Sequence, residues 1–127
     1  MIEDALDFGQ LIHGALHGIA DVYPLIPAVD ATFPLITYRR TALEEMCDKD
    51  GTAAEELAVE LTVAASDYAR SLDIACKARR AMARLTSVRM GRRDITRVRL
   101  IGATEGVEPD GLDAVYLQIL TFQITIE

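Results

Sequence analysis

Two histidines are the residues best placed by type and spacing to bind a metal ion. His13 and His17 are four residues apart, which on a helix puts both imidazoles on one side and supplies half of a metal site. No glutamate stands between them in the H-E-x-x-H arrangement, and the chain has no third histidine. We therefore interpret them as two partly exposed helix histidines, and we predict no resident metal or other cofactor.

The two cysteines, Cys47 and Cys76, lie far apart, and neither belongs to a C-x-x-C pair. This usage indicates free thiols in a reducing compartment, with a single disulfide between them as the alternative. Cys76 falls on the apolar stripe of a predicted helix, so we expect it to be a small buried hydrophobe.

Other chemistry has little support in the sequence. There is no G-x-S-x-G elbow for a serine nucleophile and no phosphate-binding loop. A group of acidic residues could offer oxygen ligands to calcium but lacks the EF-hand spacing, and we interpret it as a solvated hairpin tip. The members of this group are Asp48, Asp50, Glu55 and Glu56. No catalytic residue is predicted, and we expect the protein not to be an enzyme.

Length and composition predict one domain that spans residues 1–127. Half of the residues are hydrophobic, which is enough for a packed core. The net charge of −7 argues against a protein that coats DNA through a general basic excess. The acidic N-terminus lacks the basic region of a signal peptide, and the apolar run Ala114–Ile126 is too short for a membrane helix. We expect a soluble protein made in a cytoplasm.

Hydrophobic periodicity predicts the elements of the first half. Residues Glu3–His17 follow a helical stripe, and Val22–Pro24 is typical of a short edge strand among prolines. The alternating segments Leu35–Glu45 and Ala54–Ala65 flank the turn Asp48–Gly51, which indicates a β-hairpin.

The second half begins with Ser66 and Asp67 as candidate caps of a helix that runs to about Leu85. Strands are predicted over Ile95–Ala103 and Ala114–Ile126, with an acidic turn between them. The turn is marked by Gly106, Pro109 and Gly111. This order predicts an α+β two-layer sandwich, with a mostly antiparallel sheet of about four to five strands and both helices on one face.

Charge is unevenly distributed along the chain. Residues 1–64 contain 12 acids and 3 bases, a net charge of −9, whereas residues 65–127 contain 8 acids and 10 bases, a net charge of +2. Nine of the bases fall between Lys77 and Arg99. These charges fit three interpretations: ordinary solvated faces, a surface for nucleic acid, or a surface for the acidic half of an identical neighbour.

The third interpretation gives candidate interface residues. One subunit with unlike surfaces can associate head to tail and close into a ring. Exposed ion pairs contribute only about 0–1 kcal/mol each, so they would set register while apolar burial supplies affinity. The candidates are the basic residues Arg79, Arg80, Arg84, Arg89, Arg92, Arg93 and Arg97, and the acidic residues Glu44, Glu45, Asp48 and Asp50.

The ordered segments resemble a known family, the small tail-completion or tail-terminator proteins of long-tailed bacteriophages and prophages. Asp21–Pro24 resembles the family's I-Y-P turn, and Phe33–Tyr38 resembles its P-Y-I-x-Y strand. Val59–Ala64 is similar to the strand that leads into its Ala- and Arg-rich helix. Arg99–Ala103 and Leu120–Ile126 are similar to its closing strand pair.

The resemblance implies a structural protein without catalytic residues. Such proteins form rings, commonly hexamers, at the head-proximal end of the tail tube, where they end tube polymerisation and join the tail to the head. The implied partners are copies of the chain, the tail-tube protein and the head connector, with DNA only passing through the lumen and no membrane. The implied location is the bacterial cytoplasm during assembly and then the virion tail. The alternatives are a neck protein one layer closer to the head, and a small-ligand or metal-binding α+β domain.

Overall fold

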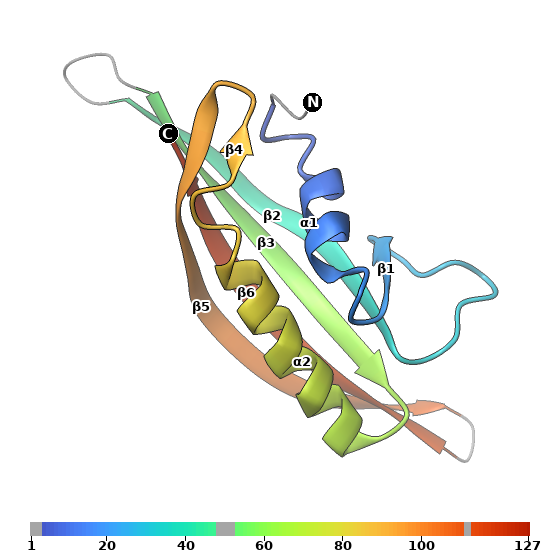
Figure 1. Cartoon of the computed structure of the whole chain (residues 1–127). Coiled ribbons are helices and arrows are strands. Elements are labelled where there is room, and N and C mark those ends of the chain that lie inside the picture. The colour runs from blue at the N-terminus through green and yellow to red at the C-terminus, as the bar shows by residue number, and fades with distance from the viewer. Residues whose placement is uncertain (1–3, 48–52, 111–112) are drawn as a thin grey trace.

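A computed structural model describes residues 4–47, 53–110 and 113–127. Two helices cover one face of a single six-stranded sheet, so the predicted α+β two-layer architecture is confirmed (Figure 1). The predicted count of four to five strands is wrong, because a two-residue strand after the second helix adds a sixth. The elements in chain order are α1 (Gly9–Leu16), β1 (Asp21–Pro24), β2 (Leu35–Cys47), β3 (Ala53–Ala65), α2 (Tyr68–Ala83), β4 (Arg89–Met90), β5 (Arg93–Asp110) and β6 (Asp113–Ile126).

The sheet is mixed, with the strand order β1-β2-β3-β6-β5-β4. β1 runs parallel to β2, whereas the remaining neighbours are antiparallel. The mostly antiparallel sheet was therefore predicted correctly, apart from the edge strand β1. The proline-containing loop 25–34 carries the chain back to the start of β2, so the two strands run in the same direction.

The main core lies between the helices and the sheet. Alternate residues of β3 and β6 point toward the helices and are buried, because their side chains alternate between the two faces of the sheet. These residues are Leu57, Val59, Leu61 and Val63 on β3, and Leu120, Phe122, Ile124 and Ile126 on β6. The opposite face, called the open face here, carries no helix (Figure 1).

Helix α1 is shorter than the predicted Glu3–His17. Residues 4–8 form a turn in which the Leu6 amide donates to the Asp4 carboxylate at 2.9 Å, and the helix begins only at Gly9. Phe8 is buried in this turn, so it fits the apolar stripe of the sequence without being helical itself. A short polar side chain offered the backbone a local alternative to the helix.

Strand β5 is much longer than the predicted Ile95–Ala103. It continues through Gly106 and Pro109, which had been predicted to form a turn, and it reaches Asp110. Gly111 lies outside the described residues. Proline is tolerated here because β5 lies at the edge of the sheet for most of its length, where a missing N–H leaves no neighbour unpaired.

Helix α2 begins at the predicted cap. The Asp67 carboxylate accepts a hydrogen bond from the Ala69 amide at 2.8 Å. The buried face of the helix follows helical spacing through Ser71, Ile74, Ala75, Ala78, Ala81 and Met82. Cys76 points away from this face and is exposed, so the prediction of a buried thiol is wrong. Ile74, Met82 and the alanines, rather than Cys76 and Leu72, are the side chains that lie against the sheet.

We expect Asp67→Ala to lower the free energy of unfolding by about 1 kcal/mol, because the cap bond to an otherwise unpaired amide is lost. Urea unfolding followed by circular dichroism measures the change. Asp67→Asn keeps an accepting oxygen and is the matched control. Equal losses in the two variants would show that the cap bond is not the cause.

Candidate interaction surfaces

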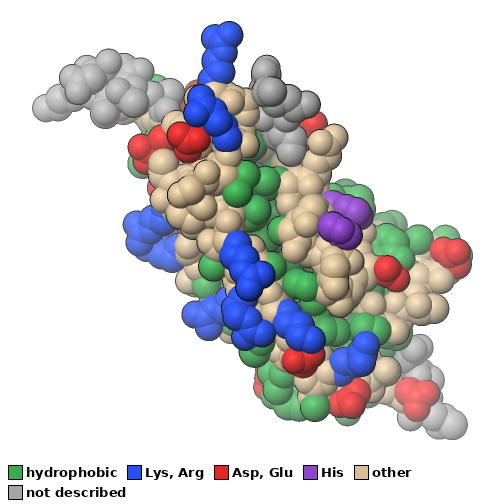
Figure 2. Space-filling view, in the orientation of Figure 1, with side chains coloured by type: hydrophobic (Ala, Val, Ile, Leu, Met, Phe, Trp, Pro, Cys, Tyr) green, Lys and Arg blue, Asp and Glu red, His purple; other side chains and the backbone are tan. Residues whose placement is uncertain are grey.

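The structure divides the predicted basic residues among three places. Arg79, Arg80 and Arg84 are exposed on the outer side of α2, where Figure 2 shows a gathering of Lys and Arg side chains. Arg89, Arg92 and Arg93 belong to the tight turn formed by β4 and the start of β5. Arg97 lies further along β5 and is exposed, and by the strand register it points to the open face.

Two of the predicted acidic residues, Glu44 and Glu45, lie on the β2 strand of the β2–β3 hairpin. Glu44 and Glu45 are exposed on β2 and stand directly opposite Glu56 and Glu55 of β3. Asp48 and Asp50 lie outside the described residues. Like charges directly opposite each other in a sheet are destabilising unless a counter-charge is near. This end of the sheet therefore favours contact with basic groups.

Arg93 supplies one such contact within the chain, since its guanidinium forms an ion pair with the Glu55 carboxylate. Both side chains are largely shielded from solvent. Reversing the charge of Arg93 would therefore disturb the fold as well as any contact between chains. A role for Arg93 toward a second copy stays a prediction.

Residues of both signs share the open face. Arg39 of β2 pairs with Glu60 of β3 at 3.1 Å between Nε and Oε1. Arg99 of β5 donates to Gln123 of β6 at 3.3 Å, and the Gln123 amide donates in turn to Glu56 of β3 at 2.8 Å. The charge segregation of the sequence thus does not become two separate faces of the subunit. Only one level of the sheet keeps it, with Glu44 and Glu45 on β2 and Arg97 and Arg99 on β5. Arg39 and Arg40 also lie on β2, and Glu105 and Glu108 also lie on β5.

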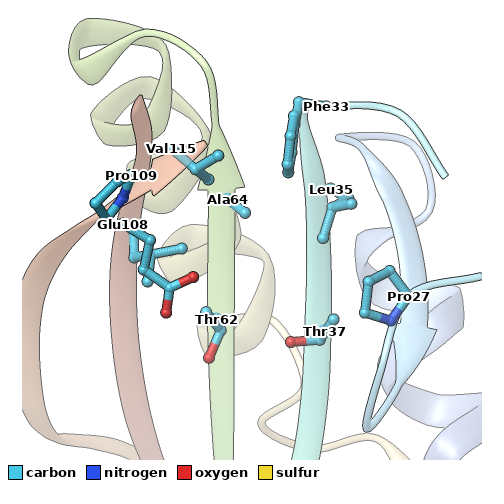
Figure 3. Close-up of a pocket in the computed structure, with 10 residues that line it drawn as sticks. Pro27, Phe33, Leu35, Thr37, Thr62, Ala64, Glu108, Pro109 and Val115 are labelled. Carbon is cyan, nitrogen blue, oxygen red and sulfur yellow. The ribbon is translucent and has the colours of Figure 1, made fainter. Parts of the chain in front are cut away.

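An apolar groove of about 400 Å³ lies on the open face at the other end of the sheet, where Leu35, Ala64 and Val115 pack together (Figure 3). The close-up shows Glu108 and Pro109 on one side of the groove and Phe33 and Pro27 on the other. The remaining lining residues are Thr37, Thr62 and Leu117. Sequence reasoning missed this groove, although apolar residues on the face opposite the core of β2, β3 and β6 were the available signal.

The loop 25–34 beside the groove exposes several apolar side chains. Leu25, Ile26 and Val29 are between 70% and 108% exposed relative to reference values, and Phe33 is 44% exposed. A cluster of exposed apolar side chains of this kind marks a contact surface. The loop and the groove together are the most apolar exposed region that we find among the described residues.

A polar network joins the start of α2 to the neighbouring strands β5 and β6. The Tyr68 hydroxyl donates to the Glu105 carboxylate at 2.8 Å, and Gln118 donates to both Glu105 and Ser71 at 3.3 Å. The hydrogen bond to Glu105 is the main cause that raises the pKa of Tyr68, with burial and the glutamate charge adding to it. The network satisfies polar groups between the layers and leaves no buried side-chain atom of the described residues without a partner.

We expect Glu105→Gln to lower the pKa of Tyr68 toward its ordinary value of 10.0, because the charged acceptor that favours the neutral phenol is removed. In the native protein the raised pKa contributes stability that is present below pH 10 and lost as the pH rises through the folded-state pKa. Ultraviolet difference titration measures this pKa. Tyr38, whose pKa is raised mainly by burial, is the internal reference and should not move. An unchanged titration would contradict the assignment.

His13 and His17 lie on α1 as predicted, both exposed, with their rings stacked at 5.5 Å between centroids. Nδ1 of His17 lies 3.1 Å from the carbonyl oxygen of His13. Within residues 4–47, 53–110 and 113–127, no three His, Cys, Asp or Glu side chains come together in a way that could hold a metal ion. The geometry therefore adds no third ligand to the predicted half site.

Comparisons with known proteins establish the fold. No family model matches the chain, and a search of curated proteins gives no match. Among solved structures, the fold is similar to that of a chain in one described as "Virion of native gene transfer agent (GTA) particle". The TM-score is 0.66 at 12% identity, and the alignment covers 98% of this chain and 87% of that chain. No helix in the described part of the chain is long and apolar enough to cross a membrane.

Proposed function

We propose that the chain is a structural protein of a phage-like virion. In this role it forms a ring at the head-proximal end of the tail tube, ends tube polymerisation and joins the tail to the head. One observation carries the proposal, namely the fold shared over 98% of the chain with a chain of a gene transfer agent virion. The ordered sequence resemblance to tail-terminator proteins supports the finer role.

The distribution of exposed groups supports a role in protein contacts. At one end of the sheet the described residues expose Glu44 and Glu45 on the β2 edge and Arg97 and Arg99 on the β5 edge. At the other end they expose an apolar loop and groove. A subunit with two unlike edges is suited to head-to-tail association with copies of itself. The apolar loop and groove then remain for the tail-tube protein or the head connector, while DNA passes through the lumen. The proposed role needs no catalysis and no cofactor.

The mass of the purified chain at low and high salt, with and without the tail-tube protein, tests this proposal. We expect assembly into a ring, commonly of six copies, that is favoured by the tube as a template. Electron microscopy of assembled particles should place the ring between tail and head. A chain that stays monomeric with the tube protein present and does not bind it would contradict the proposal. Binding to the head connector alone would instead assign the chain to the neck.

A further inference from the structure

We propose that neighbouring copies join through the edges of their sheets. In this arrangement the β2 segment Ala42–Cys47 of one copy pairs antiparallel with the β5 segment Arg97–Leu100 of the next. The inference rests on the proposed ring and specifies the contact that builds it. It also assigns an interface role to Arg99, the last of the nine bases between Lys77 and Arg99.

The first step is that both edges are open where this pairing would form. β4 pairs only with Arg93 and Asp94, and Ile95 exchanges hydrogen bonds with residues 87 and 88, which leaves β5 without an outer neighbour from Thr96 onward in the described structure. On the other side, β1 is the only described strand beside the β2 edge, and it covers residues 35–38. A row of unpaired backbone N–H and C=O groups is a template for another strand.

The second step is that the strand directions fit a ring. β2, β3, β6 and β5 alternate in direction across the sheet, so β2 and β5 run in opposite directions. Rotation of a copy about an axis along the strands therefore brings its β2 antiparallel to the β5 of its neighbour. Repetition of this heterologous contact closes the sheet and removes both open edges.

The third step is that bulges limit the length of each pairing segment. The ladder is irregular between Arg40 and Ala42 on β2, and at both ends of residues 97–100 on β5. Bulges disrupt pairing, so they divide each edge into separate regular segments. Beyond β1, the β2 edge offers Ala42–Cys47, and the β5 edge offers Arg97–Leu100 and Gly102–Asp110. Of the two β5 segments, Arg97–Leu100 lies at the level of Ala42–Glu44 in the register of the sheet.

The fourth step is that the facing side chains are complementary. Glu44, Glu56, Thr125 and Arg97 occupy one cross-strand row on the open face, as the register of the three ladders shows. When the ring closes at this level, Glu44 of one copy lies directly opposite either Arg97 or Arg99 of the next copy. The second of these two arginines then lies diagonally across from Glu44, within the reach of long side chains. The repulsion between Glu44 and Glu56 is then offset by two arginines.

The same pairing continues the core on the helix side of the sheet. Leu43, Val98 and Leu100 point to that side and are half-buried against the core at the two edges of one subunit. Antiparallel pairing brings Leu43 of one copy beside Val98 or Leu100 of the next. Apolar contact therefore supplies affinity, and the charged row on the open face supplies the register.

Disulfide cross-linking tests the contact. Within one chain, Glu44 on β2 is separated from Arg97 and Arg99 on β5 by the strands β3 and β6. This separation is three strand spacings, about 14 Å, which no disulfide can span. A bond between them therefore reports contact between copies. We would combine Glu44→Cys with Arg99→Cys, or with Arg97→Cys, in a chain that also carries Cys47→Ser and Cys76→Ser. After mild oxidation we expect a ladder of covalent multimers that disappears on reduction.

The control variant pairs Glu44→Cys with Arg79→Cys, which is exposed on α2 and tests the rival contact between the acidic hairpin and the helix. One contrary result would be rings of normal mass that cross-link only in the Glu44→Cys and Arg79→Cys pair, and another would be rings of normal mass that cross-link in no pair at all. Either result would overturn edge pairing and leave the proposed ring intact. If the unmodified chain also failed to assemble with the tube protein present, both the edge pairing and the proposed ring would be overturned.

Charge exchange gives a second readout. We expect Glu44→Arg alone, or Arg97→Glu with Arg99→Glu, to weaken association roughly tenfold, because like charges then meet at the edge. The three changes together should restore most of the affinity, since the pairs are exchanged rather than removed. Losses that simply add, with no recovery, would contradict the pairing of these residues.

Discussion

Leu61→Asp is expected to unfold the protein. Leu61 is fully buried at the middle of β3, between Tyr38 of β2 and Leu120 of β6. An aspartate there either buries a carboxylate with no partner or pulls the strand out of the core. The expected loss exceeds about 4 kcal/mol, a large part of the roughly 5–15 kcal/mol that holds a domain of this size together. Circular dichroism and urea unfolding measure the outcome.

The same substitution at Leu25 is the matched control. Leu25 is 70% exposed and has a φ of 64°, a backbone conformation that aspartate tolerates better than leucine does. Leu25→Asp should therefore unfold at nearly the urea concentration of the natural chain. A cooperative, equally stable Leu61→Asp variant would show that β3 is not the centre of the core.

Phe122→Ala is expected to cost about 3–5 kcal/mol, the range for a large aromatic side chain removed from a core. Phe122 is 2% exposed on β6, between Val59 of β3 and Leu100 of β5. It also lines a small pocket with Arg79 and Ala83 of α2. The alanine variant leaves a cavity between the two layers, and the midpoint of urea unfolding should fall at an unchanged slope.

Phe122→Leu separates the cavity from the loss of the aromatic ring. Leucine fills most of the volume, so its cost should be well below that of alanine. Similar losses of unfolding free energy in the two variants would indicate that α2 collapses onto the sheet. An alanine variant whose free energy of unfolding lies within about 1 kcal/mol of the natural chain would refute the burial of Phe122.

The strands with clean alternation were predictable from sequence. β2, β3 and β6 alternate over long stretches, and their bounds agree with prediction to within two residues. The errors fall where local chemistry and tertiary context disagree. Gly106 and Pro109 have turn propensities, but the pairing of β5 with β6 carries them into a strand. Cys76 was placed on the wrong side of α2 because its helix offers two overlapping apolar stripes.

The candidate surfaces were predictable only in part. The charged segments were visible in the sequence, but their division among a helix, a turn and a sheet edge depends on topology. Arg93 and Glu55, for example, are 38 residues apart and meet only because β3, β6 and β5 are neighbours. The groove likewise needs β2, β3, β5 and β6 to be in register at one end. No local pattern contains this information.

The two long hairpins overshoot the body of the sheet at opposite poles. Beyond Glu55, residues 46–47 and 53–54 pair only with each other, and beyond Tyr116, residues 108–110 and 113–115 do the same (Figure 1). A two-stranded ribbon without a third strand is only marginally stable in water. Its backbone amides therefore open at lower free energy than those of the central strands. In the proposed ring, each subunit would extend one of these marginally stable ribbons in each direction along the ring axis, and partners above and below the ring would contact the ribbons first.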